Sequence, residues 1–224
     1  MYKIIFFLLL STITFAQNTT DELGRKQGKW KQNYESGNLR YDGTFVDDNP
    51  SGIFLYYTER GILKANLEYF NDGTSASARL YHPNGKVKAV GLYENEKKEK
   101  QWKYYDTRNN LIRQEHYTDG QLNGETQLFY TDGNLLETTN YSKGKKEGKC
   151  TQYYRNGQVK ISANYKANKL DGLYTLYNSE GVKKYQGKYL DDIKDGIWKY
   201  YKDNKSFDYQ LKYINGISQG RQDG

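Results

Sequence analysis

The stretch GKWKQNYESGNLRYDGTFVDDNPS, residues 28–51, contains the pattern that decides the fold. It begins with a glycine and an aromatic segment, passes Gly37, and continues through residues 39–45, where apolar and polar residues alternate. A period of two predicts a β-strand with one face toward a core and the other toward water. Aromatic side chains fit such a pleated surface, and glycine allows the positive φ of a tight turn. The stretch therefore predicts one β-hairpin.

This hairpin pattern recurs with a strict period of 24 residues and without insertions. Regularity of this kind is the signature of a repeat protein. The eight units begin at Gly28, Gly52, Ala76, Lys100, Gly124, Gly148, Gly172 and Gly196, and Gly220 begins a ninth. Seventeen residues after each start the residue is aromatic, namely Phe45, Tyr69, Tyr93, Tyr117, Tyr141, Tyr165, Tyr189 and Tyr213. Nine residues after the start six units have a glycine, namely Gly37, Gly61, Gly85, Gly133, Gly157 and Gly181, whereas the other two have Asn109 and Lys205.

These units predict an all-β fold, an elongated single-layer twisted antiparallel sheet of eight hairpins over residues 28–219. One hairpin is not stable alone, so the stability is expected to come from contacts between neighbouring units. Residues 17–27 are expected to cover the first edge of the sheet, and residues 220–224 to form a short stub at the other. The repeated aromatic residues and turn glycines are accordingly predicted to have structural roles.

The first sixteen residues have the character of a secretory signal peptide. Lys3 precedes an apolar run from Ile4 to Leu10, and a segment with small residues ends at Ala16. The run is shorter than the roughly 20 residues that a membrane-spanning helix needs. We therefore predict cleavage between Ala16 and Gln17, and export of residues 17–224 to the periplasm or the medium.

The composition excludes several classes of partner. Only 36% of the residues are hydrophobic, yet the chain has 24 Tyr and 22 Gly, which favours thin β-structure over disorder. The net charge of +7 is spread over mixtures of Lys and Glu, such as residues 94–100. We therefore expect no nucleic-acid partner, and contact with an anionic membrane stays an open alternative. The single cysteine, Cys150, excludes an internal disulfide and is expected to be a buried apolar residue.

Nothing in the sequence predicts catalysis. The two histidines, His82 and His116, lie at unrelated positions of their units, and no phosphate loop or nucleophile motif is present. An uninterrupted single layer also offers no deep pocket in which to desolvate a reacting centre. The prediction is a protein that is not an enzyme, with no catalytic residue, cofactor or metal ion.

The tryptophans and their neighbouring tyrosines are the candidate ligand contacts. These residues are Trp30, Trp102 and Trp198, with Tyr56, Tyr104 and Tyr200. Exposed rings could stack on sugars or contact a protein. Alternatively they form the only core of the sheet, which is the interpretation we favour.

The pattern Gly-x-Trp-x-Tyr-Tyr at residues 196–201, with its counterparts throughout residues 28–219, resembles the bacterial variant of the MORN repeat. The resemblance implies an elongated sheet of successive hairpins. Similar chains are often labelled antitoxins, which implies a cytoplasmic role and conflicts with the signal peptide. An exported immunity protein that meets an incoming toxin would reconcile the two.

The sequence thus leaves three functions in order of preference. The first is a non-enzymatic exported scaffold that binds a protein partner, in the manner of an antitoxin or immunity protein. The second is binding of cell-wall or other glycans through exposed aromatic residues. The third is attachment to an anionic membrane surface.

Overall fold

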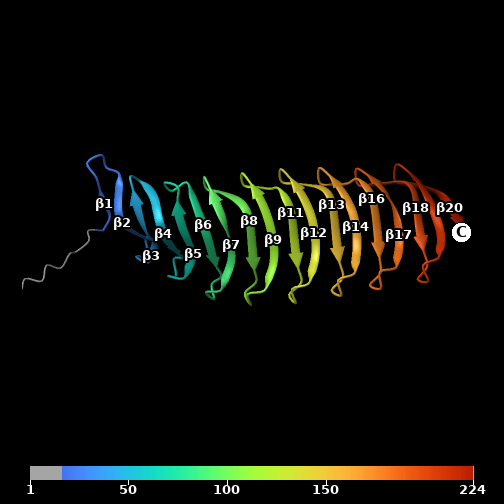
Figure 1. The fold of residues 1–224 in the computed structure, drawn as a ribbon, viewed down its shortest axis with the longest axis horizontal. Coiled ribbons are helices and arrows are strands. Elements are labelled where there is room, and N and C mark those ends of the chain that lie inside the picture. The colour runs from blue at the N-terminus through green and yellow to red at the C-terminus, as the bar shows by residue number, and fades with distance from the viewer. Residues whose placement is uncertain (1–16, 224) are drawn as a thin grey trace, which may run out of the picture.

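The chain folds into one long antiparallel sheet. The structure is a computed structural model that describes residues 17–223, and it contains 20 strands in a single sheet, without helices. Most strands pair with the strands beside them in the sequence, and the hairpins stand in a row along the long axis (Figure 1). The strands of the first half are β1 (Thr19–Thr20), β2 (Lys26–Asn33), β3 (Leu39–Val46), β4 (Asn49–Tyr57), β5 (Leu63–Phe70), β6 (Ser75–Tyr81), β7 (Val87–Glu94), β8 (Lys97–Tyr105), β9 (Leu111–Thr118) and β10 (Gln121–Leu122). Those of the second half are β11 (Gly124–Phe129), β12 (Leu135–Ser142), β13 (Lys145–Tyr153), β14 (Val159–Lys166), β15 (Lys169–Leu170), β16 (Gly172–Tyr177), β17 (Lys183–Leu190), β18 (Ile193–Tyr201), β19 (Phe207–Ile214) and β20 (Ile217–Asp223).

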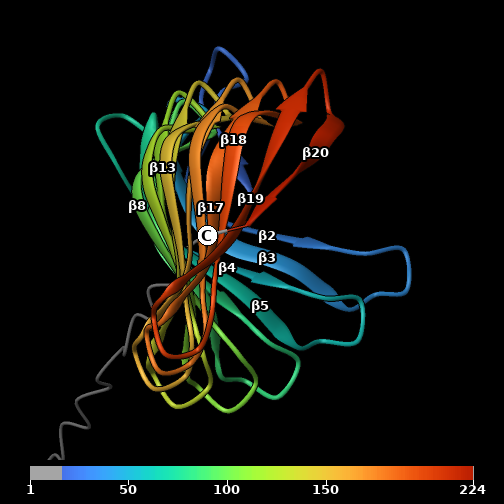
Figure 2. The ribbon, with the colours of Figure 1, turned by 90° about the vertical axis from the view of Figure 1, so that its right-hand side faces the viewer.

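The sheet is twisted along its length. Viewed along the row, the hairpins of β2 to β5 point in a different direction from those near β17 and β18 (Figure 2). L-residues impose a consistent twist on neighbouring strands, and many strands accumulate it. The predicted architecture, an elongated twisted antiparallel sheet, is therefore confirmed.

The first turn of each hairpin has the backbone that its glycine predicts. Gly37, Gly133 and Gly157 have φ values of 85°, 88° and 84°. The two units without glycine adopt the same conformation, with φ of 76° at Asn109 and 69° at Lys205. The turn geometry is therefore set by the hairpin, and glycine is the residue that adopts it at least cost.

The second turn, which joins one hairpin to the next, has two residues in the regular units. Lys143 and Gly144 make the turn, with φ of 48° and 77°, and β13 already begins at Lys145. Two-residue turns with positive φ at both positions match the twist of the flanking strands. The starting glycine of the unit, Gly148, lies inside the strand with φ of 80°, where the pairing with β12 shifts register. It thus forms a β-bulge and does not begin the strand.

Lys100 occupies this bulge position with φ of 57°. A residue with a Cβ loses about 1–2 kcal/mol of stability in the left-handed region. Glycine avoids this cost, but it also increases the conformational entropy of the unfolded chain, which offsets part of the gain. We expect Lys100→Gly to raise the free energy of unfolding by about 0.5–1 kcal/mol, measured by urea denaturation. Gly148→Lys is the reciprocal control and should lower it, so equal stability of both variants would contradict this explanation.

The third unit departs from the others at its start, where it has Ala76. β5 and β6 pair without a register shift, from Ala65 opposite Leu80 to Phe70 opposite Ser75. Since the period of 24 residues is kept, the residues that form the bulge elsewhere lie here in a longer turn, residues 71–74, in which Asn71, Asp72 and Gly73 all have positive φ. A Cβ at the bulge position does not by itself cause this change, because Lys100 forms the bulge with one.

The core is a row of large side chains facing very small ones on the preceding strand. Phe54, Trp102 and Trp198 are the largest fully buried side chains of residues 17–223. A Cβ added to Gly43, Gly91 or Gly187 would lie 2.2–2.3 Å from the ring eleven residues later. The indole N–H of Trp102 also donates to the carbonyl of Leu92 at 3.0 Å. Each ring therefore fits over a glycine. The same side of the sheet carries Tyr56, Tyr104 and Tyr200, and we call it the tyrosine face.

The two ends of the sheet differ. β1 pairs with Lys26 and Gln27 of β2, and Asn18 makes further bonds to Lys31, so residues 17–27 cover part of this first strand. At the other end, residues 220–223 extend β20, which pairs with β19 over most of its length. Residues 220–223 are consequently part of the last strand of the sheet.

Candidate functional site

The tryptophans proposed as ligand contacts lie in the core. Trp102 and Trp198 have 0% exposed surface, so neither ring offers an area to a ligand in this structure. Trp30, under the first edge, is half-buried, and its indole N–H donates to the carbonyl of Thr19. The arrangement is that of the core interpretation, in which the rings stabilise the sheet.

The three tyrosines proposed beside them are half-buried on the tyrosine face. The hydroxyls of Tyr56 and Tyr69 are 3.2 Å apart, and Tyr200 stacks on Tyr209 with ring centroids 4.5 Å apart. The ring of Tyr104 packs beside that of Trp102, and its hydroxyl accepts a hydrogen bond from Lys98. Burial is the main cause that raises the pKa of Tyr56, Tyr104 and Tyr200. Only part of the surface of each ring is therefore exposed and able to contact a ligand.

Four lysines lie over the aromatic row. Lys26, Lys98, Lys146 and Lys194 place their ammonium groups 4.3–5.2 Å from the centroids of neighbouring rings. The last three are separated by 48 residues, which is two units. An ammonium group over an aromatic face is attracted by the ring quadrupole. The four ammonium groups therefore cover the aromatic core and do not form a separate basic patch.

A charged cluster interrupts the aromatic face at the fourth unit. Lys98 donates to the Tyr104 hydroxyl at 2.7 Å, and Tyr117 donates to a carboxylate oxygen of Glu115 at 2.7 Å. Arg113 lies over the ring of Tyr104, and its Nε is 3.2 Å from Glu115 in the geometry of an ion pair, without a hydrogen bond. Burial lowers the pKa of Lys98. All of these groups except the Nε of Arg113 have a hydrogen-bond partner within the cluster, which indicates a structural network more than a binding site.

The histidines and the cysteine are held by the fold. His82 is 2.9 Å from the carbonyl of Tyr105, where Tyr34, Tyr130 and Tyr154 make the same bond in their units. His116 bonds the carbonyl of Glu125. Cys150 is buried, which raises the pKa of its thiol. Among residues 17–223, no three His, Cys, Asp or Glu side chains group as they would around a metal ion.

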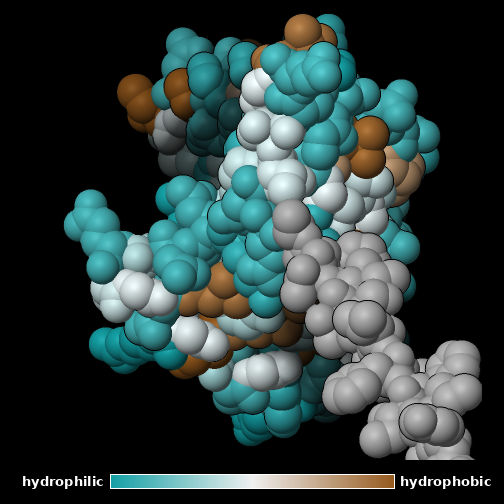
Figure 3. Space-filling view, turned by 90° about the vertical axis from the view of Figure 1, so that its left-hand side faces the viewer, coloured by the Kyte–Doolittle hydropathy of each residue, from teal (hydrophilic) through white to brown (hydrophobic). Residues whose placement is uncertain are grey.

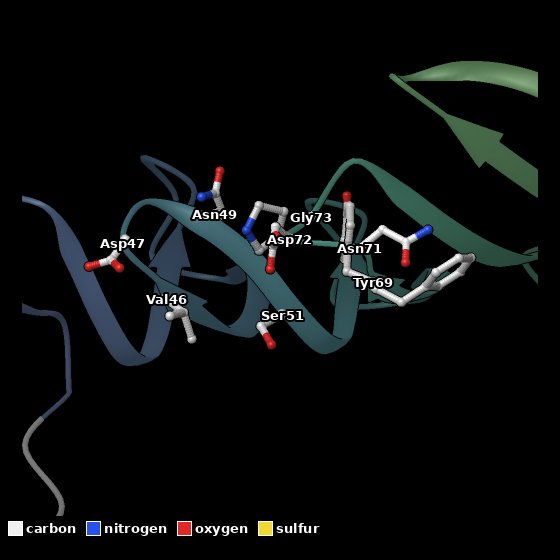
Figure 4. Close-up of a pocket in the computed structure, with 10 residues that line it drawn as sticks. Val46, Asp47, Asn49, Ser51, Tyr69, Asn71, Asp72 and Gly73 are labelled. Carbon is white, nitrogen blue, oxygen red and sulfur yellow. The ribbon is translucent and has the colours of Figure 1, made fainter.

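A hollow lies at the irregular turn of residues 71–74, which precedes the third unit. It has a volume of about 580 Å³ and is lined by residues 46–47 and 49–51 of one turn and residues 69–73 of the next. Figure 4 shows Asp47 and Asn49 on the first turn and Asn71 and Asp72 on the second. An adjoining hollow of about 570 Å³ shares four of these residues and extends over the tyrosine face to Tyr56 and Tyr93. Sequence reasoning expected no pocket, although the change from glycine to Ala76 was visible.

The other distinctive surface is an aliphatic ridge on the face opposite the tyrosines. Its members are Leu173, Leu190, Ile193, Ile197, Ile214 and Ile217, each 43–68% exposed. Leu190 pairs with Ile193, and Ile214 pairs with Ile217. A Cβ on Gly216 would lie 3.1 Å from Ile193, so the two hairpin ends are in contact. Leu190, Ile193, Ile214 and Ile217 thus lie together at one end of the last hairpins, and Leu173 and Ile197 lie on the same face beside Lys188 and Lys212.

The middle of the sheet has no such ridge. At the positions of Leu190, Ile193 and Ile197, the unit two periods earlier has Ser142, Lys145 and Lys149. The surface at the N-terminal end is mostly hydrophilic as well, with a hydrophobic area framed by polar side chains (Figure 3). Because scattered apolar residues are normal but contiguous ones are not, the ridge is the surface most suited to a partner.

Three comparisons relate the chain to known proteins. A family model described as MORN repeat variant matches residues 26–47, 77–95, 122–143 and 146–167. No curated protein matches the chain.

None of residues 17–223 forms a helix with the length and apolar character that crossing a bilayer demands.

The similar solved structures share only part of the chain. A point mutant of TarM from S. aureus, in complex with fondaparinux, α-GlcNAc-glycerol and UDP, has a TM-score of 0.33 and 13% identity over 43% of this chain. A GtfA/B complex bound to UDP and GlcNAc has a TM-score of 0.22 and 21% identity over 50% of this chain. The chain spans 19% and 22% of the lengths of these two proteins. Its regular hairpins and the four matched segments show a sheet of MORN-like repeats.

Proposed function

We propose that this chain is a non-enzymatic exported scaffold that binds a protein partner through the aliphatic ridge. The observation that supports this proposal is a group of four half-exposed aliphatic side chains, Leu190, Ile193, Ile214 and Ile217, with Leu173 and Ile197 on the same face of the sheet. Soluble proteins rarely expose such patches without a binding role. A repeat fold is suited to this task because it presents long continuous surfaces.

The charge around the ridge favours a particular kind of partner. Lys188 and Lys212 lie on the same face, paired with Leu173 and Ile197, and Lys199 lies one row further. None of these three lysines makes an ion pair within residues 17–223. A partner with an apolar strip bordered by carboxylates would complement both the ridge and its rim. A narrower proposal, implied by the resemblance alone, is that this partner is a toxin and the chain its immunity protein.

Export is part of the same proposal. Its support is the sequence of residues 1–16, which lie outside the described residues. A partner would then be met in the periplasm or the medium. The mass of the mature chain recovered from the source cells tests this location, because cleavage after Ala16 leaves Gln17 as the first residue.

A graft within the sheet tests the ridge. Leu190→Ser, Ile193→Lys and Ile197→Lys together give the last hairpins the residues that the middle of the sheet has at these positions. Used as bait against envelope and secreted proteins, residues 17–224 should retain one stoichiometric protein, and the graft should retain at least ~10-fold less, a loss of about 1.4 kcal/mol. Ser142→Ala is the matched control at an equivalent site and should bind normally.

Two results would contradict the proposal. One is that the wild-type chain retains no protein. The other is equal retention by the graft and the wild-type chain, which would place the partner elsewhere on the sheet. Because all three changed residues are exposed, the melting temperature of the graft should be close to that of the wild type.

A further inference from the structure

The turn of residues 71–74 breaks a contact that joins successive hairpins. In regular units, the backbone N–H of the second turn residue donates to a carbonyl of the previous hairpin, as from Gly120 to Lys98 at 3.0 Å and from Gly144 to Leu122 at 2.8 Å. The equivalent acceptor for the turn of residues 71–74 is the carbonyl of Pro50. Within residues 17–223 no such bond reaches it, and the turn closes on itself through Gly73 and Thr74. The row of turn tips is therefore interrupted at this place.

The interruption is the origin of the hollow. The longer turn packs against Pro50 so closely that a Cβ on Gly73 would lie 2.7 Å from the proline ring. Beside this contact, an open space of about 580 Å³ lies between the two turns. That volume falls in the range of about 300–1,000 Å³ that is typical of small-molecule sites. Local departures from an otherwise consistent pattern are where functional sites are expected.

The hollow is lined by polar groups with unused hydrogen-bonding capacity. The side chains of Asn49, Ser51 and Asp72 make no hydrogen bond or ion pair within the described residues. Asp47 holds Gln27 and Arg25 through Oδ1, at 2.7 Å and 2.9 Å, which leaves its Oδ2 unoccupied by them. Acceptors and donors of these kinds pair with hydroxyl groups.

An aromatic ring completes the lining. Phe70 is 43% exposed at the end of β5. A ring beside carboxylate, amide and hydroxyl groups suits a ligand that has C–H faces and hydroxyl edges together, which is the chemistry of a sugar ring. The two carboxylates, Asp47 and Asp72, would repel an acidic sugar. We propose that this hollow binds an uncharged oligosaccharide, with Phe70 against a sugar face and Asp72 and Asn49 on its hydroxyls.

This site is separate from the aliphatic ridge, because it is built by the first and second units and the ridge lies at the other end of the sheet. It does not depend on the buried tryptophans. The adjoining hollow, which shares Asn49 and Tyr69, provides a path for a longer chain of sugars over the tyrosine face.

Titration calorimetry with chitotetraose, cellotetraose and maltotetraose tests the proposal on residues 17–224. At least one of the three should bind with a Kd of about 1 mM or tighter, a value on the order of −4 kcal/mol. Phe70→Ala and Asp72→Asn should each weaken binding by ~10-fold, which corresponds to about 1.4 kcal/mol. Ser142→Ala, at the position equivalent to Phe70, should leave it unchanged.

Three outcomes would overturn the proposal. These are no binding of any of the three sugars, binding that neither variant weakens, and binding of a sulfated oligosaccharide in preference to all of them. Both changed side chains are exposed, so circular dichroism should show an intact sheet. The ridge graft should still bind the sugar, and Phe70→Ala should still retain the protein partner, so failure of either proposal is recognised separately.

Discussion

Replacing Trp102 with alanine is expected to lower the free energy of unfolding by about 3–5 kcal/mol, because a fully buried ring leaves a cavity that the neighbouring strands cannot close. The loss also removes the indole bond to Leu92. Urea denaturation followed by far-ultraviolet circular dichroism measures it. Gln101→Ala, an exposed neighbour on the other face, is the control and should have little effect. A Trp102→Ala chain as stable as the control would contradict the assignment of this ring to the core.

The partner of this ring tests the packing in a second way. Gly91→Ala should destabilise the sheet by about 1–3 kcal/mol, because its Cβ would overlap a ring that has no space to move. The chain itself contains a compensated version, since Ala163 precedes Tyr174 at the same two positions. We therefore expect Gly91→Ala combined with Trp102→Tyr to be more stable than the sum of the single changes predicts, with a coupling energy of about 0.5–3 kcal/mol. Additive effects would contradict a shared cavity.

Alkaline pH is expected to unfold the sheet. Burial is the largest cause that raises the pKa of many ring hydroxyls above the ordinary value of 10. The tyrosines concerned are Tyr56, Tyr93, Tyr104, Tyr117, Tyr141, Tyr165, Tyr174, Tyr189 and Tyr200. A folded-state pKa above the unfolded one means that the unfolded chain loses protons first. The stability that these hydroxyls contribute is therefore complete below about pH 10 and declines as the pH rises beyond it.

Tyrosinate absorbance and circular dichroism, recorded together against pH, measure this effect. We expect the two signals to change in one cooperative step above about pH 10, because the rings ionise as they leave the core. Tyr104→Phe removes one of the shifted hydroxyls and should make the decline of stability with pH shallower. Ionisation near the ordinary tyrosine pKa with an unchanged circular dichroism signal would show that the tyrosine row is not part of the core.

The hairpins and their turns could be predicted because they depend on local properties. Alternation of apolar and polar residues fixes which side of a strand faces the core, and a 24-residue period without insertions fixes how hairpins succeed one another. The expected positive φ is present even at Asn109 and Lys205, where glycine is absent. The second turn also has a local signal, because residue pairs such as Lys143-Gly144 and Asn215-Gly216 are typical of two-residue turns.

The burial of the tryptophans could not be read from the repeats alone. It depends on residues eleven positions earlier, since Gly91 and Gly187 leave the space that Trp102 and Trp198 fill. A comparison of these two positions along the chain would have found the signal, because large residues follow small ones, as at Gly43 and Phe54 or at Ala163 and Tyr174. The hollow was also missed, because its cause is an exception to the repeat.

Turn chemistry and strand alternation act between residues close together in the chain, and they are sufficient to specify a meandering sheet of 24-residue hairpins. Which rings are buried, where a hollow opens and which aliphatic residues meet on one face are fixed only when the strands pack side by side. Those properties depend on side-chain volumes and register across neighbouring strands, as between β5 and β6, where the pairing has no register shift and the turn before Ser75 is longer.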